Sequence, residues 1–151
     1  KAADRLSAQF RERTVEKTYL GVTTGPAPTE SGLLEQWLRK DTDANRVHIA
    51  AEGEEGARNA VTEWRALERR GGLTLFELKP RTGRPHQLRV ACKSLGAPLA
   101  GDLKYGAREP LPDKSIALHA AQLAFDHPTR EERLEFKASP PDAEIWKGWR
   151  L

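Results

Sequence analysis

The chain has 151 residues, of which 38% are hydrophobic and 31% charged, and its formal net charge is +3. A chain of this length buries roughly 68–70% of its unfolded surface, which is enough for one core and favours a single domain. No apolar run is long enough to cross a bilayer, so we expect no membrane partner. The one cysteine, Cys92, excludes an internal disulfide framework. We therefore expect a cytoplasmic protein in which this thiol is a small buried helix residue.

The first third of the chain predicts one helix followed by strands. Ala3, Leu6 and Phe10 recur at helical spacing and predict a helix over residues 2–13. The segments expected after it are a strand over 16–24, a loop rich in Pro, Gly and Thr over 25–31, a short strand over 46–51 and a turn over 53–56.

Residues 60–70 fit two structures. Their composition is typical of a helix, yet Thr62 and Trp64 belong to an alternating pattern that favours a strand. Gly71-Gly72 follows, and a glycine pair between two such runs is typical of a hairpin. We therefore predict a strand here that pairs with a second strand from Leu73 to Leu78.

A dense run of basic residues extends from Lys79 to Lys93, with five Lys/Arg and no acid. Thr82-Gly83 predicts a tight turn, and Pro85 fits the first position of a helix, where its missing N–H costs nothing. An apolar stripe at helical spacing continues to Gly96, which predicts the end of that helix. The segment thus predicts a cationic turn that opens a helix.

Such a turn is suited to bind an anion. The helix N-terminus adds partial positive charge and free N–H donors. Phosphate is the natural ligand, and a nucleic acid is the commonest polymer that carries it. Two alternatives stay open: the run is a solvated surface, or Arg84 and Arg89 are structural and hold a carboxylate across a cleft.

Signatures of other chemistries are absent from the sequence. The four histidines lack partners at metal-ligand spacing, and a single cysteine cannot build a zinc ribbon. The chain contains no G-x-x-x-x-G-K-[ST], G-x-G-x-x-G or G-x-S-x-G segment. From the residues alone we therefore expect no metal site, and neither nucleotide-binding fingerprint nor the serine-hydrolase elbow is present.

The C-terminal third predicts a hairpin and a closing helix. Strands over 115–126 and 132–137 flank a turn over 127–130. Ser139-Pro140-Pro141-Asp142 is expected to cap a terminal helix.

Four ordered motifs together resemble the RluA-type pseudouridine synthases, which isomerise uridine to pseudouridine in structured RNA. The central motif is T-G-R-P-H-Q-L-R at residues 82–89, and G-A-P-L-A-G-D-L-K-Y-G follows at 96–106. Residues 9–20 resemble the family's helix and the strand that carries its active-site tyrosine. Residues 117–120 and 125–128 resemble its closing strands. The resemblance implies an α+β fold, a mixed, largely antiparallel sheet flanked by a few helices, and it supports the strand over 60–70.

The resemblance also implies roles for five residues. Arg89 would pair with the family's nucleophilic aspartate, and Tyr19 would stack on the flipped target base. Lys17, Arg84 and His86 would contact the RNA. From the residues alone, a half-buried strand aromatic for Tyr19, solvated cations for Lys17 and Arg84, and a satisfied structural histidine for His86 are the alternatives.

Two further residues and the partners complete these expectations. Asp102 and Tyr105 are expected to be structural, with the Asp102 carboxylate bonded to its own turn. The partner implied is structured RNA, either rRNA or tRNA, and we expect a monomer without metal or cofactor.

One family feature does not match. The nucleophilic aspartate of the family lies in an H-R-L-D-type segment shortly before the helix, whereas here Arg-Leu is followed by Ser7 or Glu135. The chain contains no Met and starts at Lys1. We infer that residues 1–151 are the C-terminal portion of one catalytic domain, inactive alone, whose missing part carries the nucleophile. The rivals are a noncatalytic RNA-binding module and a phosphate-ester enzyme that uses the Arg84/Arg89 loop.

Overall fold

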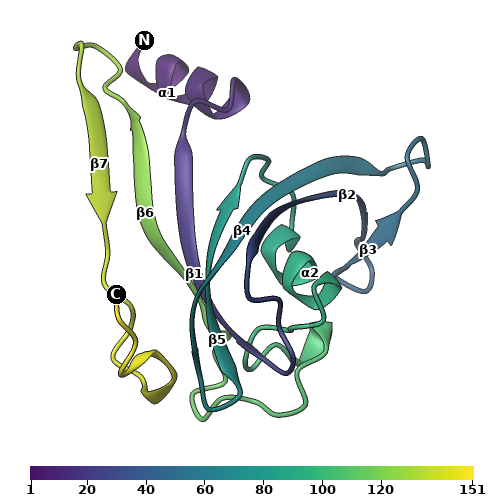
Figure 1. Ribbon diagram of the computed structural model, residues 1–151. Coiled ribbons are helices and arrows are strands. Elements are labelled where there is room, and N and C mark those ends of the chain that lie inside the picture. Colours follow the sequence, from purple (N-terminus) through teal and green to yellow (C-terminus); the bar gives the residue numbers. More distant parts are fainter.

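Seven strands form one continuous sheet in the computed structural model, which describes residues 1–151 (Figure 1). Their order across the sheet is β3-β2-β4-β5-β1-β6-β7, and every neighbouring pair is antiparallel. The expectation of a largely antiparallel α+β fold is confirmed, with no parallel pair. The strands are β1 (Glu16–Thr24), β2 (Ser31–Asp41), β3 (Arg46–Ala50), β4 (Arg58–Arg70), β5 (Leu73–Pro80), β6 (Leu118–Asp126) and β7 (Arg133–Lys137).

Two α-helices and two 3-10 turns accompany the sheet. They are α1 (Ala2–Arg11), α2 (Gln87–Ser94), η1 (Leu103–Tyr105) and η2 (Glu144–Trp146). Figure 1 shows α2 against the concave side of the curved part of the sheet, and α1 at the end of β1 and β6. Neither helix has the length and apolar character needed to cross a bilayer.

The strand predictions are confirmed with small shifts at the ends, but β2 was missed. In β2 every second residue from Gly32 to Leu38 is buried or half-buried. The residues between them include two large apolar ones, the exposed Leu33 and the half-buried Trp37. A glycine and a glutamine on the inner side, with large apolar residues on the outer side, hide the alternation that normally reveals a strand. The sequence therefore predicts a loop over 25–31 and no strand between it and the one expected over 46–51.

One face of the sheet packs against α2. Phe76 and Leu78 of β5 form a buried cluster with Leu88 and Cys92 of α2, and Leu99 completes it. A neighbouring cluster joins β2, β3 and β4 to α2 through Leu38, Val47, Ala60, Val90 and Tyr105. The buried Cys92 agrees with the structural role expected for it, and burial raises the pKa of its thiol to about 12.

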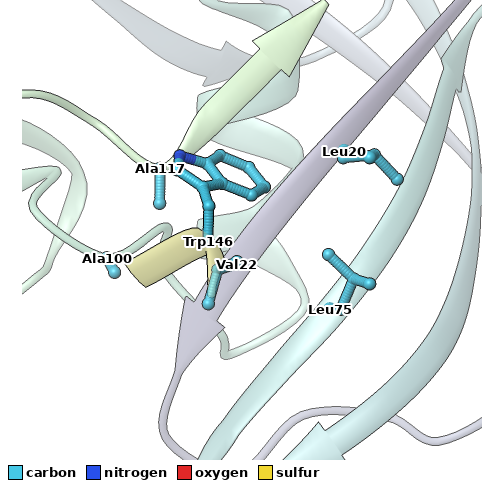
Figure 2. Close-up of a cluster of buried hydrophobic side chains, with 6 residues drawn as sticks. All are labelled: Leu20, Val22, Leu75, Ala100, Ala117 and Trp146. Carbon is cyan, nitrogen blue, oxygen red and sulfur yellow. The ribbon is translucent and has the colours of Figure 1, made fainter. Parts of the chain in front are cut away.

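The opposite face is covered by the C-terminal segment. Trp146 of η2 packs with Leu20 and Val22 of β1, Leu75 of β5, and Ala117 (Figure 2). The terminal α-helix expected after Asp142 is wrong: η2 has only three residues, and its N-cap is Ala143 with no side-chain cap bond. The indole thus covers the core from a single turn, which ends where Lys147 is extended and Gly148 has a left-handed φ of 82°.

Both ends of α2 depend on local backbone geometry. The prediction that Pro85 opens the helix is wrong, because α2 begins at Gln87 and its N-cap, His86, has a left-handed backbone with φ 52°. The predicted stop at Gly96 is confirmed. Gly96 has φ 77°, its N–H donates to the carbonyl of Lys93 at 2.9 Å, and the next N–H donates to the carbonyl of Cys92 at 3.1 Å. This pair of bonds is the Schellman motif, which favours glycine.

Candidate functional site: a cationic cleft and an arginine network

The turn before α2 is fixed by one buried amide. The Gln87 side chain accepts the Arg84 N–H at 3.0 Å and the Thr82 hydroxyl at 2.6 Å. Its amide nitrogen donates to the Val61 carbonyl at 3.0 Å and to the Thr62 hydroxyl at 2.9 Å, both on β4. A fully bonded amide that is 3% exposed ties the turn rigidly to the sheet.

Arg84 is held by this turn and by β4. Its Nε donates to the Asn59 carbonyl at 2.7 Å, and the side chain is part-buried. Burial is the main cause that lowers the pKa of Arg84, and the nearby charges of Arg13 and Arg58 lower it further. The guanidinium forms no ion pair, so its charge is available to a ligand.

α1 is positioned by polar contacts rather than by burial. None of its residues is buried, and Phe10 is 56% exposed. The Gln9 side chain donates to the Asp126 carbonyl and accepts the Asp126 N–H, both at 2.8 Å. The helix ends just before Arg13, which has a left-handed φ of 60°. The helix end is thereby held beside the start of β1.

The end of α1, the start of β1 and the turn before α2 enclose a cleft of about 420 Å³, called the cationic cleft below. Five of its nine lining residues are Lys or Arg and none is acidic. The residues that line it are Phe10, Arg11, Arg13, Val15, Lys17, Arg81, Thr82, Gly83 and Arg84. The cleft therefore brings together Lys17 and Arg84, two residues that the sequence singled out, with two arginines that it missed.

Lys17, in the lining of this cleft, is half-buried. The ammonium forms no hydrogen bond or ion pair, and burial lowers the pKa of Lys17. Its Nζ lies 3.5 Å from the place where a Cβ on Gly83 would stand. The glycine thus leaves room beside the ammonium that any side chain would begin to fill.

Arg89 lies outside the cleft and already has an acidic partner. Its Nε and Nη2 donate to the two carboxylate oxygens of Asp102 at 2.9 and 2.7 Å. The Asp102 side chain is completely buried, and the Arg89 side chain is 19% exposed. This hydrogen bond is the main cause that raises the pKa of Arg89. The prediction that the Asp102 carboxylate bonds to its own turn is wrong, because the fork of Arg89 offers two charge-assisted bonds.

Tyr105 supports the same arginine from another side. The Arg89 guanidinium carbon lies 4.8 Å from the Tyr105 ring centre, a cation–π distance. The Tyr105 hydroxyl accepts the Val47 N–H at 2.8 Å and meets Nδ1 of His86 at 2.6 Å. Arg89, Asp102, Tyr105 and His86 form a connected set, called the arginine network below.

His86 has the contacts of a structural histidine. Its ring packs edge-on against Tyr105, with centroids 5.6 Å apart. Burial is the main cause that lowers the pKa of His86, and the positive charge of Arg89 adds to the effect. In the neutral tautomer that carries its proton on Nε2, Nδ1 can accept a hydrogen bond from the Tyr105 hydroxyl. The structure therefore groups His86 with Arg89 rather than with Lys17 and Arg84.

Tyr19 lies on β1, opposite Leu78 of β5 and Ala120 of β6. It is half-buried and packs at the edge of the cluster formed by β5 and α2. A β-bulge between Thr18 and Tyr19 interrupts the pairing with β6 at this point. Tyr19 and Arg89 do not line the cationic cleft.

The basic run of residues 79–93 is divided in the fold. Lys79 lies 3.9 Å from the Glu77 carboxylate, Arg81 pairs with Glu63, and Arg89 pairs with Asp102. Sequence spacing places these cations together. In the fold Lys79 and Arg81 still line the same surface cavities, whereas Arg89 is turned away from them toward Asp102. No group of three or more His, Cys, Asp or Glu side chains is placed to hold a metal ion.

Comparisons with known proteins support the resemblance found in the motifs. Residues 1–94 match the family described as RNA pseudouridylate synthase. An uncharacterized RNA pseudouridine synthase of Bacillus subtilis, YlyB, is 38% identical over 142 residues, covering 93% of this chain and 46% of the relative. Ribosomal large subunit pseudouridine synthase C of Vibrio cholerae is 34% identical, covering 91% of this chain and 44% of the relative.

Solved structures share the fold. Human RNA pseudouridylate synthase domain containing 1 superposes with a TM-score of 0.71 at 32% identity, over 93% of this chain and 60% of that one. Human RNA pseudouridylate synthase domain containing 4 superposes with a TM-score of 0.74 at 25% identity, over 93% of this chain and 63% of that one. The chain spans about half the length of the curated relatives it matches. Since the family match covers more than half of the chain, the chain belongs to the RNA pseudouridylate synthase family.

Proposed function

We propose that residues 1–151 are the C-terminal portion of a catalytic domain that isomerises uridine to pseudouridine in RNA. The observation that carries the proposal is the family match over residues 1–94, which includes both Tyr19 and Arg89. The reaction exchanges the bond between C1′ and N1 of uracil for a bond between C1′ and C5. C5 loses a hydrogen and N1 gains one, so the isomerisation consumes no co-substrate, and we propose that it uses no metal or organic cofactor.

Arg89 is proposed to orient the nucleophilic carboxylate that the family carries upstream of α1. Asp102 occupies Nε and Nη2, whereas Nη1 has no hydrogen-bond partner. A guanidinium has five N–H donors in a rigid fork, so it can bind a second carboxylate while the first fixes its plane. In this proposal Asp102 positions Arg89, and it does not attack the substrate because its side chain is completely buried.

Tyr19 is proposed to stack on the target base. A uridine that reacts at C1′ and C5 must leave the stack, and the flipped base needs a flat surface to pack against. Tyr19 is half-buried at the edge of the α2 face, on the strand whose neighbouring Lys17 reaches the cationic cleft.

The substrate proposed first is ribosomal RNA, because a relative from Vibrio cholerae and one from Neisseria meningitidis are named for the large ribosomal subunit. Transfer RNA is the second substrate to assay. We also propose that the protein acts as a monomer in the cytoplasm, where its single, buried cysteine stays reduced.

The test uses the chain extended at its N-terminus by the coding sequence that precedes Lys1. RNA carrying tritium at C5 of uridine releases the tritium on isomerisation, because C5 exchanges its hydrogen for a bond to C1′. We expect release by the extended protein and none by residues 1–151 alone. No release by the extended protein on ribosomal or transfer RNA would contradict the proposed activity.

Two variants of the extended protein test the roles of the side chains. Arg89→Lys keeps the charge but loses the planar fork, so release should fall by about 10²-fold while RNA affinity changes little. Tyr19→Phe keeps the ring and should retain most activity, whereas Tyr19→Leu should lose it. Weakened binding at normal turnover in Arg89→Lys would make Arg89 an RNA contact.

A noncatalytic RNA-binding module is the second candidate function. The observation that favours it is that the only carboxylate bonded to Arg89 is the buried Asp102. The coding sequence upstream of Lys1 separates the two candidates: an Arg-Leu-Asp segment there supports the enzyme, and its absence supports the module.

A further inference from the structure

The cationic cleft holds more positive charge than the protein neutralises. Of its five cations only Arg81 forms an ion pair, with the half-buried Glu63. Arg11, Arg13, Lys17 and Arg84 have no acidic partner, although the chain forms ion pairs at many other places. Like charges gathered in one cleft repel each other, so the arrangement favours the binding of an anion.

The cations reach the cleft from two segments that are far apart in the chain. Arg11 is the last residue of α1, and Arg13 follows its C-cap with a left-handed backbone. Arg84 comes from the rigid turn held by Gln87, and its Nε is fixed on the Asn59 carbonyl. An anion bound here would therefore bridge α1 and the turn before α2.

The cleft also keeps space for a ligand beside the Lys17 ammonium. Lys17 is half-buried without a partner, and Gly83 leaves open the volume beside its ammonium. The φ of Gly83 is not in the left-handed region, so the backbone here does not itself require glycine. Burial lowers the pKa of Lys17 because it disfavours the charged ammonium. A bound anion would offset this cost of burying the charge.

We propose that the cationic cleft binds phosphodiester groups of the RNA strand, with Arg11 and Arg13 as phosphate contacts beside Lys17 and Arg84. The inference rests on the proposed function and adds α1 to the RNA-binding surface. Several arginines around an open cleft suit the successive phosphates of a strand, because each guanidinium can hold one phosphate through two parallel bonds. His86 and Arg89 take no part, because both are engaged in the arginine network.

The test measures binding of residues 1–151 to a fluorescein-labelled RNA stem-loop over a range of salt concentrations. Arg11→Ala/Arg13→Ala should weaken binding at least tenfold at low salt. It should also lower the log K against log salt slope by about 1.4–1.8, that is about 0.7–0.9 for each phosphate that an arginine no longer neutralises. The matched control, Arg108→Ala/Arg150→Ala, removes the same charge from residues outside the cleft and should leave the slope unchanged.

A second variant blocks the cleft without changing its charge. Gly83→Val fills the space beside Lys17 and should weaken binding severalfold, with normal thermal unfolding as the control for folding. Equal slopes for the wild type and the double variant, or no RNA binding by the wild type, would overturn the proposal.

Tritium release by the extended protein is a separate readout. RNA binding that depends on the cleft, without any tritium release, would support the proposed role of the cleft and contradict the proposed activity. If Arg11→Ala/Arg13→Ala changes neither the tritium release nor the slope of log K against log salt, the proposed role of the cleft is contradicted and the proposed activity is supported.

Discussion

The cationic cleft and the arginine network both adjoin the turn before α2, and they differ in whether their positive charges have acidic partners within the fold. In the network, Arg89 has a bidentate carboxylate, an aromatic ring against its face, and a completely buried partner. In the cleft, Lys17 and Arg84 have no acidic partner. Removing one partner of a buried ion pair destabilises the fold, whereas cations left without partners are available to bind a ligand. Substitutions in the two regions should therefore affect stability and RNA binding differently.

The largest stability loss is expected from the arginine network. Asp102→Asn removes the only anion bonded to Arg89 and leaves a largely buried guanidinium without a charged partner. Breaking a buried pair in this way costs about 3–5 kcal/mol, which a urea unfolding curve measures. The control is Arg89→Met/Asp102→Leu, which replaces both charges by apolar side chains and should recover most of the loss. A stability loss below about 1 kcal/mol in Asp102→Asn would show that the pair is as weak as an exposed one.

In the cleft, removing a charge is expected to raise the free energy of unfolding rather than lower it. Lys17→Met keeps an apolar stem of similar length and removes a half-buried charge that solvent screens in part. The free energy of unfolding should therefore rise by about 0.5–1 kcal/mol while RNA affinity falls. Urea unfolding and the RNA titration measure the two effects on the same variant.

The pH dependence gives an independent check of this prediction. The pKa of Lys17 in the folded chain lies below its ordinary value of 10.5. The penalty for the charge is therefore complete below the folded pKa and disappears above 10.5. The difference in stability between Lys17→Met and the wild type should shrink as pH rises through this window. A difference that grows would mean that the ammonium has a favourable partner.

A smaller effect should follow from freeing the one paired cation of the cleft. Glu63→Gln leaves Arg81, whose side chain is exposed, without its acidic partner. The added local charge should strengthen RNA binding by about threefold, equivalent to roughly 0.6 kcal/mol, since exposed pairs contribute about 0.2–1 kcal/mol. Glu68→Gln is the control, because it removes an equal charge outside the cleft. Unchanged affinity in Glu63→Gln would exclude Arg81 from the binding surface.

The smallest effect concerns His86. Its folded pKa lies below its ordinary value of 6.5, so as the pH falls the unfolded chain binds a proton first. The stabilisation by the neutral ring is therefore present above 6.5 and is lost as pH falls toward the lower folded value. Thermal unfolding of the wild type and His86→Gln should differ by about 2–4 °C at most, with the difference smaller in acid. A wild type that gains relative stability in acid would contradict a neutral His86.

The sequence predicts those parts of the fold in which local pattern and tertiary environment agree. The strand β4 was predicted because Thr62 and Trp64 alternate with outward residues, and Gly96 was predicted because a left-handed helix end favours glycine. Pro85 was misplaced because the buried Gln87 amide, a tertiary contact, fixes the turn and delays the helix start. Such a contact leaves no signal in the local spacing.

The candidate site was predicted only in part, because some of its residues are brought together by tertiary contacts that local spacing does not reveal. Lys17 and Arg84 were selected, and the fold brings them together in one cleft. Arg11 and Arg13 were missed because their position beside Arg84 depends on how α1 is held against β6, through Gln9 and the backbone of Asp126. The partner of Arg89 was missed because Asp102 approaches it only after the chain has turned back from α2.

The most direct test of the contrast between the two regions is a single titration of the ¹⁵N-labelled chain with the RNA stem-loop, followed by amide chemical shifts. We expect progressive shifts at Arg11, Arg13, Lys17 and Gly83, and amides of His86, Arg89, Asp102 and Tyr105 that stay in place. Shifts centred on the arginine network, with the amides of the cationic cleft unmoved, would show that the network and not the cleft binds RNA.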